Sequence, residues 1–316
     1  MSDAEGFDFT SNSPATVGWG GTAPDPQSDV LPAIERGAEQ LQRLVDAFDM
    51  PPMKLLTAIS ILCLPVLAMG QEYETSENDA RILSAYHGLD ALPARAMRLC
   101  GMPIEGEDGM PVIFSVQIDN DSLSPEAFEV ETGAGEFVTP ICATLRPALE
   151  SLERRTVLLV GPFGTVDSSP NAIEVVGPLQ DVAGNSLTGL RIENVTALPE
   201  GPSLVLAERF GPTATGLEGE CPEEAVQAVL LTWEGGVTGP QGANLEEPQR
   251  TAMTVLLENG ESVNPLSLGD DDPDNHVIAC LSESSPAVSV SIEAGFFHDP
   301  GDDANPETSI EVISKI

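Results

Sequence analysis

The sequence predicts a mainly β protein in which two β-rich domains follow a short N-terminal helix. The chain has 29 glycines and 27 prolines among 316 residues, and such a composition favours many turns over long helices. Apolar residues make up 41% of the chain and aromatic residues only 4%, so Val, Leu, Ile and Ala must fill most of the core. Short apolar runs alternate with turn signals at roughly the 8–12-residue spacing of a β-sandwich.

The first β-rich domain is expected over residues 95–212. Its clearest signal is the alternation of Val112, Phe114, Val116 and Ile118 with other residues, at the period of two that a strand produces. Turn residues separate this run from the next. Further strands are expected at 127–130, 156–160, 173–176, 190–195 and 204–207. The continuous apolar run at 156–160 is typical of a buried strand.

The second β-rich domain is expected over residues 213–316. The stretch 225–233 is apolar and can form a strand, and the stretch 288–292 alternates Val, Ser, Val, Ser and Ile. Other strands are expected at 251–257, 276–281 and 310–313. Both blocks therefore have the pattern of antiparallel β structure.

A short helical segment is expected before the first domain, within residues 71–94. Ser76 is a candidate N-cap. Ile82, Leu83 and Tyr86 would then form one apolar face of a helix that runs from Ser76 to Tyr86.

The segment Met53–Gly70 has the order of a secretory signal peptide. One cation, Lys54, precedes the uncharged apolar stretch Leu55–Met69, and small residues stand at Ala68 and Gly70. The apolar stretch has about 15 residues, fewer than the ~20 that span a bilayer as a helix. We therefore expect cleavage near Ala68 or Gly70, and a secreted or periplasmic protein with no stable membrane span. A buried core helix and an uncleaved anchor are the alternatives.

Residues 1–52 precede this segment and form a leader with an unusual position. Residues 1–30 have a disordered composition, and residues 30–48 can form an amphipathic helix. Because signal peptides normally begin at the start of a chain, we expect that Met53 or Met50 is the true first residue.

The net charge of −38 limits the classes of partner. Only two lysines occur, and the other cations are arginines. Such a field repels nucleic acid and anionic lipid head groups and attracts cations. Adaptation to a saline medium and specific binding of divalent cations both explain the acidity.

Cysteine usage indicates disulfides. Without Cys63, which lies in the signal segment, Cys100, Cys142, Cys221 and Cys280 remain, and an exported protein meets an oxidising compartment. Of the three possible pairings, Cys100–Cys142 and Cys221–Cys280 keep each bond within one domain. Each bond would stabilise the fold by about 3–4 kcal/mol. No CxxC motif or Cys/His cluster occurs, so the sequence does not predict a zinc site.

Two stretches carry a family resemblance: LSPEAFEVETGAGEFVTP at 123–140 and VVGPLQDVAGNSLTG at 175–189. They resemble the bacterial Ig-like β-sandwich domains of S-layer and surface proteins, over residues 95–212. The resemblance implies a structural or binding module with no catalytic residues to carry over. The chain departs from the family by the insert 146–155 and by having no tryptophan in this block.

Two acidic loops are candidate calcium sites because Ca²⁺ takes oxygen ligands. The first loop, 269–275, lacks the Gly and Glu that an EF-hand requires at its sixth and twelfth positions. The second loop is 298–305. Their candidate ligands are Asp270, Asp272, Asp274, Asn275, Asp299, Asp302 and Asp303. Solvated acidic loops without an ion are the alternative.

No recognisable catalytic motif is present, and we expect His276, beside Asp274, to be a surface histidine rather than a base. The sequence therefore favours an exported non-enzymatic binding or structural module, at the cell surface or in the periplasm, whose partner is an unidentified protein or glycan. The alternative is a secreted hydrolase, for example one acting on glycans, with paired carboxylates in a cleft between the domains.

Overall fold

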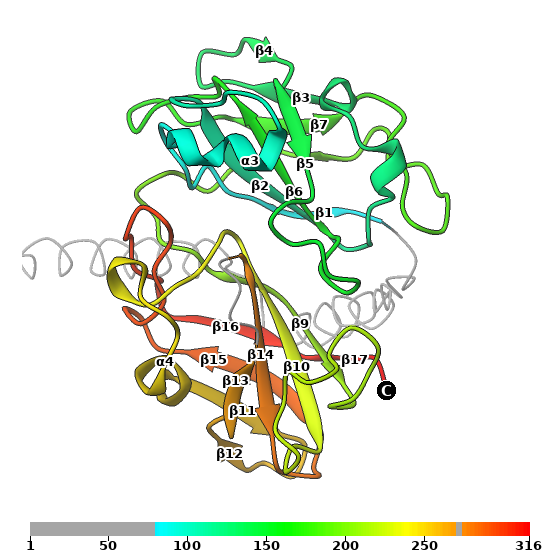
Figure 1. The fold of residues 1–316 in the computed structure, drawn as a ribbon, viewed down its shortest axis with the longest axis vertical. Helices are drawn as coiled ribbons and strands as arrows, with labels where there is room; N and C mark the ends of the chain where they lie inside the picture. Colours follow the sequence, from blue (N-terminus) through cyan, green and yellow to red (C-terminus); the bar gives the residue numbers. More distant parts are fainter. Residues whose placement is uncertain (1–79, 270–273) are drawn as a thin grey trace, which may run out of the picture. The chain divides into compact units, whose positions relative to one another are not determined.

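The computed structural model describes residues 80–269 and 274–316 (Figure 1). They belong to one compact unit, Thr75–Ile316. The expected leader at 1–52 and the signal segment at 53–70 lie outside the described residues, as do Asp270 and Asp272.

The first part of this unit is a β-sandwich of two four-stranded antiparallel sheets, with strand orders β1-β2-β6-β5 and β4-β3-β7-β8. The strands are β1 Ile82–Ala85, β2 Asp108–Phe114, β3 Phe128–Glu131, β4 Phe137–Val138, β5 Cys142–Thr144, β6 Thr156–Gly161, β7 Ala172–Val175 and β8 Arg191–Ile192. Short helices lie in its connections: η2 Ala94–Ala96, α3 Met97–Cys100, η3 Asn120–Ser122 and η4 Pro125–Ala127.

The second part has the same plan. Its sheets have the orders β13-β14-β10-β9-β17 and β12-β11-β15-β16. The strands are β9 Leu204–Phe210, β10 Gln227–Trp233, β11 Met253–Leu257, β12 Ser262–Val263, β13 Ser267–Gly269, β14 His276–Leu281, β15 Ala287–Ile292, β16 Thr308–Glu311 and β17 Ile313–Ser314. Its short helices are η5 Pro240–Gly242 and α4 Glu247–Ala252. The protein is therefore mainly β, as the sequence predicts.

The two sandwiches are tandem copies of one fold. When β9 to β16 are matched in order to β1 to β8, every sheet neighbour is preserved. The match extends to sequence in one hairpin, GEFVTP at 135–140 and GESVNP at 260–265. In each copy the glycine N–H donates to the carbonyl oxygen three residues earlier, at 2.9 Å. The sequence prediction of two unlike domains did not detect this repeat.

Each sandwich buries its central strands on both faces, which explains their continuous apolar runs. In β6, Val157 and Leu159 face the core between the two sheets, and Leu158 and Val160 pack against the connection before β2. The alternation follows from the period of two along a strand. The second sandwich repeats it in β10 and β14.

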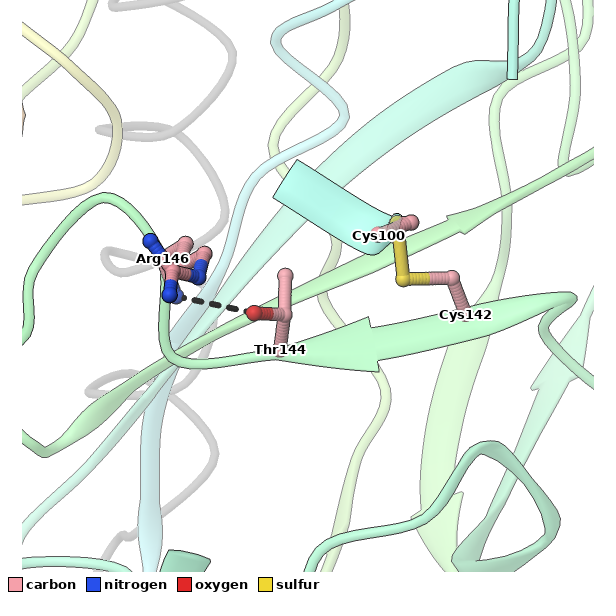
Figure 2. The surroundings of a disulfide bond; sticks show 4 residues. All are labelled: Cys100, Cys142, Thr144 and Arg146. Atoms are coloured by element: carbon pink, nitrogen blue, oxygen red, sulfur yellow. Dashed lines mark hydrogen bonds between the residues drawn. A yellow bond between two sulfur atoms is a disulfide. The ribbon is translucent and has the colours of Figure 1, made fainter. Parts of the chain in front are cut away.

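Each sandwich has one disulfide, which joins the connection between its first two strands to the sheet that this connection covers. Cys100 of α3 is bonded to Cys142 of β5 (Figure 2). Close to it, the backbone N–H of Arg146 donates a hydrogen bond to the Thr144 hydroxyl. The second bond is Cys221–Cys280. These are the pairs that the sequence favours. Each bond therefore holds this connection against the outer face of the sheet that contains β2 and β6 in the first sandwich, or β10 and β14 in the second.

Two sequence predictions about the domain plan are wrong. The helix expected from Ser76 to Tyr86 is replaced, over Ile82–Ala85, by strand β1, which pairs with β2. Tertiary pairing overrides a weak local helix pattern there. The expected boundary at residue 212 also moves, because β9 belongs to the second sandwich. Among the described residues, no helix is long and apolar enough to cross a membrane.

Candidate functional site

The predicted calcium loop at 298–305 is a structured turn whose counterpart lies in the first sandwich. Asp299 Oδ1 accepts the N–H groups of Gly301 and Asp303 at 2.9 and 2.8 Å. Asp181 Oδ1 accepts the N–H groups of Ala183 and Asn185 at the same two distances. The loop read as a metal site and the turn that carries the family resemblance are therefore equivalent.

The side chains of the 298–305 loop have separate partners. Asp302 Oδ1 accepts the Gln241 N–H at 2.7 Å and lies 2.9 Å from His298 Nδ1. Asp299 Oδ2 faces Tyr86 of the first sandwich. Asp303 is half-buried next to Asp299. Calcium binding by this loop stays a prediction.

Tyr86 is the central contact between the two sandwiches. Its hydroxyl lies 2.6 Å from the carbonyl oxygen of Glu200 and 2.8 Å from Asp299 Oδ2. Its ring lies against Gly88 and Gly235, where a Cβ atom would approach ring carbons within 2.2 and 2.6 Å. Gly88 and Gly235 therefore leave room for this ring.

The same contact affects the pKa of Asp299. A tyrosine hydroxyl has one hydrogen, yet the Tyr86 oxygen faces two acceptors, Glu200 and Asp299. Burial raises the pKa of Asp299, the nearby charge of Asp303 adds to the rise, and the hydrogen bonds to its carboxylate oppose it. A proton on Asp299 would donate to the Tyr86 oxygen and leave the Tyr86 hydrogen for Glu200.

Glu234 makes a second polar contact at the junction. Its Oε1 accepts the hydroxyls of Ser84 and Thr196 at 2.9 and 2.8 Å, and its Oε2 accepts the Ser203 N–H at 3.1 Å. Glu234 and Glu200 line a shallow pocket between residues 196–203 and 304–306. The hydrolase alternative requires paired carboxylates in a cleft between the domains, and it stays a prediction.

A buried ion pair completes the junction. Arg155, directly before β6, lies 2.9 Å from Glu208 of β9. Arg155 also donates to the Ser115 carbonyl oxygen, and Lys315 lies 3.3 Å from Glu208. Burial lowers the pKa of Arg155, and the charge of Glu208 opposes this effect. The pair therefore joins the start of β6 in the first sandwich to β9 in the second.

His276 is buried, so the expectation of a surface histidine is wrong. It is the first residue of β14 and is 1% exposed. Its neighbours are Asp274 and Glu153, which are 2% and 5% exposed. One ligand-type atom of each residue lies within 4.8 Å of the other two. Asp274 Oδ1 accepts the His276 N–H at 2.7 Å and lies 3.6 Å from the ring nitrogen Nδ1.

This cluster lies where the two sandwiches meet. Glu153 is in the connection before β6, while Asp274 and His276 precede and begin β14. Asn275, between them, donates from Nδ2 to the Thr156 hydroxyl at 3.0 Å. Of the predicted calcium ligands in the loop 269–275, the described Asp274 lies in this cluster, and Asn275 is engaged in the junction.

A second buried histidine has a different setting. His87 Nε2 lies 3.6 Å from Asp108 Oδ2, and that oxygen accepts the N–H groups of Phe163 and Gly164. Burial raises the pKa of Asp108, but the His87 side chain and the two N–H groups outweigh it, so the pKa is lowered. This pair fixes a loop within the first sandwich.

Sequence reasoning missed Glu153, Arg155, Tyr86 and Glu234. Glu153 and Arg155 lie in the stretch 146–155, which the sequence marks only as a departure from the family. Their signal is their position directly before a buried strand, where a charged side chain in a core-forming region needs a partner.

Comparisons with known proteins give no family. No family model and no curated protein matches the chain. One similar solved structure is described as the N-terminal part of the bacterial S-layer protein SbsC, with 12% identity and a TM-score of 0.25. The match covers 74% of this chain and 44% of that one, so the chain spans less than half the length of that structure. The fold described above rests on the strand pairing.

Proposed function

We propose that the chain is an exported, non-enzymatic module of the cell surface, built from two tandem Ig-like sandwiches. The observation that carries the proposal is that each sandwich has its own disulfide across its outer layer. Disulfides persist in oxidising compartments and are rare in the cytosol. They indicate an extracellular or surface protein.

The strand order supports the Ig-like assignment. Constant-type Ig domains pair strands A, B, E and D in one sheet and strands C, F and G in the other. If β1 to β8 are lettered in chain order with β4 as C′, the first sandwich has the sheets ABED and C′CFG. The second sandwich has the same two sheets, with β17 added beside β9.

The junction supports a structural role. Three polar contacts connect the two sandwiches. They join Tyr86 to Asp299, Ser84 to Glu234, and Arg155 to Glu208. Burial of a charged pair requires that both partners stay in place, because loss of one leaves an unpaired charge. Such contacts favour two sandwiches that act as one body.

The partner that fits this proposal is a protein or glycan at the surface, with nucleic acid disfavoured by the charge of −38. Calcium remains part of the proposal as an ion that the acidic loops could bind. Secretion and retention in a periplasm are both compatible with the two disulfides.

The test is the location of the protein in the cells that produce it. Intact cells are treated with a protease, and the protein is followed with an antibody against the second sandwich. The proposal predicts cleavage or release without lysis, or recovery in a periplasmic extract. Recovery only from the cytosol would contradict it. Sugar release from cell-wall polysaccharides by the purified protein would instead support the hydrolase alternative.

A further inference from the structure

His276 is a buried side chain that lacks a hydrogen-bond partner. Within the described part of the chain, neither ring nitrogen has one, and Asp274 Oδ2 also has none. The His276 side chain is 0% exposed and that of Asp274 is 1% exposed. A buried polar group without a partner costs about 1–3 kcal/mol, and native proteins seldom retain one. Three such atoms in adjoining side chains therefore point to a missing ligand.

The charge of the cluster also calls for a cation. Glu153 and Asp274 bring two carboxylates to one buried place, and buried carboxylates at short range repel unless a proton or a cation lies between them. Arg155, a buried cation two residues after Glu153 in the chain, is paired with Glu208.

We propose that Glu153, Asp274 and His276 bind one divalent transition-metal ion, of which Zn²⁺ is the representative, and that this ion links the two sandwiches. The inference stands apart from the proposed function, since the site would form wherever the protein acts.

The donor set selects the class of ion. Imidazole nitrogen together with carboxylate oxygen suits zinc and its first-row neighbours, while calcium takes oxygen ligands at six to eight positions. Zinc binds His and Asp or Glu at about 2.0–2.2 Å. The three ligand-type atoms lie within 4.8 Å of one another, so binding would draw them slightly together.

The position of the ligands gives the ion a structural effect. Glu153 comes from the first sandwich, and Asp274 and His276 come from the second. A ligand that binds only the folded state raises the free energy of unfolding. Above the dissociation constant, this rise grows with the logarithm of the ligand concentration. An ion held from both sides would therefore stabilise the junction.

The test uses the full chain, purified without a polyhistidine tag, with both disulfides intact and metal removed by a chelator. Zn²⁺ is titrated by calorimetry, and the melting temperature is recorded with and without it. The proposal predicts one Zn²⁺ per chain and a melting temperature that rises with Zn²⁺. A wild-type chain that takes up no Zn²⁺, or whose melting temperature Zn²⁺ leaves unchanged, would overturn it.

Variants locate the ion. Glu153→Gln keeps the shape of the side chain and removes its charge. It should weaken Zn²⁺ binding by more than about 10-fold, because loss of a group that only hydrogen-bonds to a metal ligand already costs about that much. His298→Ala removes a partly exposed histidine elsewhere and should bind Zn²⁺ as the wild type does. Wild-type affinity in Glu153→Gln, or loss of binding in His298→Ala, would contradict the assignment.

X-ray absorption at the zinc edge tests the same site in the wild type, with no need for a variant that folds. The spectrum should show one imidazole nitrogen with oxygen ligands. A sulfur ligand at about 2.3 Å would place the ion on Cys63 instead and would overturn the proposal.

Discussion

Asp181 and Asp299 occupy the same position in two copies of one turn, the first within the first sandwich and the second at the junction. Each uses Oδ1 to accept two backbone N–H groups. Their second oxygens differ: Asp181 Oδ2 accepts the Asn185 side-chain amide at 2.8 Å, and Asp299 Oδ2 faces Tyr86. The second copy of the turn therefore makes a contact between the sandwiches that the first copy does not make.

Asp181→Ala should destabilise the first sandwich. The substitution leaves the N–H groups of Ala183 and Asn185 without their acceptor, which should lower the free energy of unfolding by about 1–3 kcal/mol. Urea unfolding measures the change. Asp167→Ala, which removes an exposed acid from the loop before β7, is the control and should change the free energy by less than about 0.5 kcal/mol. Equal effects of the two variants would contradict the role of Asp181.

Gly184→Ala should cost stability through the backbone alone. Gly184 has φ of +83°, and an added Cβ would meet no atom within 4 Å. The left-handed conformation should therefore lower the free energy of unfolding by about 1–2 kcal/mol. Gly211→Ala is the matched control, because its Cβ also meets open space and its φ is outside the left-handed range. Thermal unfolding of the two variants should separate them, and a similar cost in both would contradict the assigned strain.

Gly235→Ala should disturb the junction. The new Cβ would lie 2.6 Å from Cδ1 of the Tyr86 ring, and crowding of this kind costs about 1–3 kcal/mol. Because the clash involves one ring, Tyr86→Leu in the same chain should relieve part of the cost. A double-mutant cycle measures the coupling. Additive effects of the two substitutions would show that Tyr86 and Gly235 do not touch.

The pH dependence of stability should report the raised pKa of Asp299. A carboxyl whose pKa is higher in the folded state favours folding when protonated, so its contribution falls as pH rises from the unfolded value of about 3.9 through the folded pKa. Asp299→Asn keeps an acceptor for Gly301 and Asp303 and places an amide donor near Tyr86. Relative to the wild type, the variant should gain stability from acid to neutral pH.

Urea midpoints at several pH values measure this difference. The lowered pKa of Asp108 acts in the opposite direction in both proteins and therefore cancels in the comparison. A stability difference that is constant with pH would contradict the raised pKa of Asp299.

The sequence predicted what depends on local pattern. The alternation from Val112 to Phe114 and the apolar run from Thr156 to Val160 both form central strands. The cysteine pairing followed from keeping each bond within one block. The tandem repeat was not visible, because few identities besides the GE-x-V-x-P hairpin remain between the copies.

The candidate site depended on contacts across the junction, which no local pattern carries. Asp274 was identified as a ligand from its neighbours in the loop, yet its spatial partners are Glu153, far away in the chain, and His276. The segment with Ile82 looked helical because its pairing with β2 is not encoded within it. Only the fold brings these residues together.

Peptide mapping of the protein isolated from the cells that produce it, digested without reduction after free thiols are blocked, tests the central claim most directly. An exported protein of two disulfide-bonded sandwiches should give linked peptides that contain Cys100 with Cys142 and Cys221 with Cys280. Blocked free thiols at these four cysteines, or links between the two pairs, would contradict it.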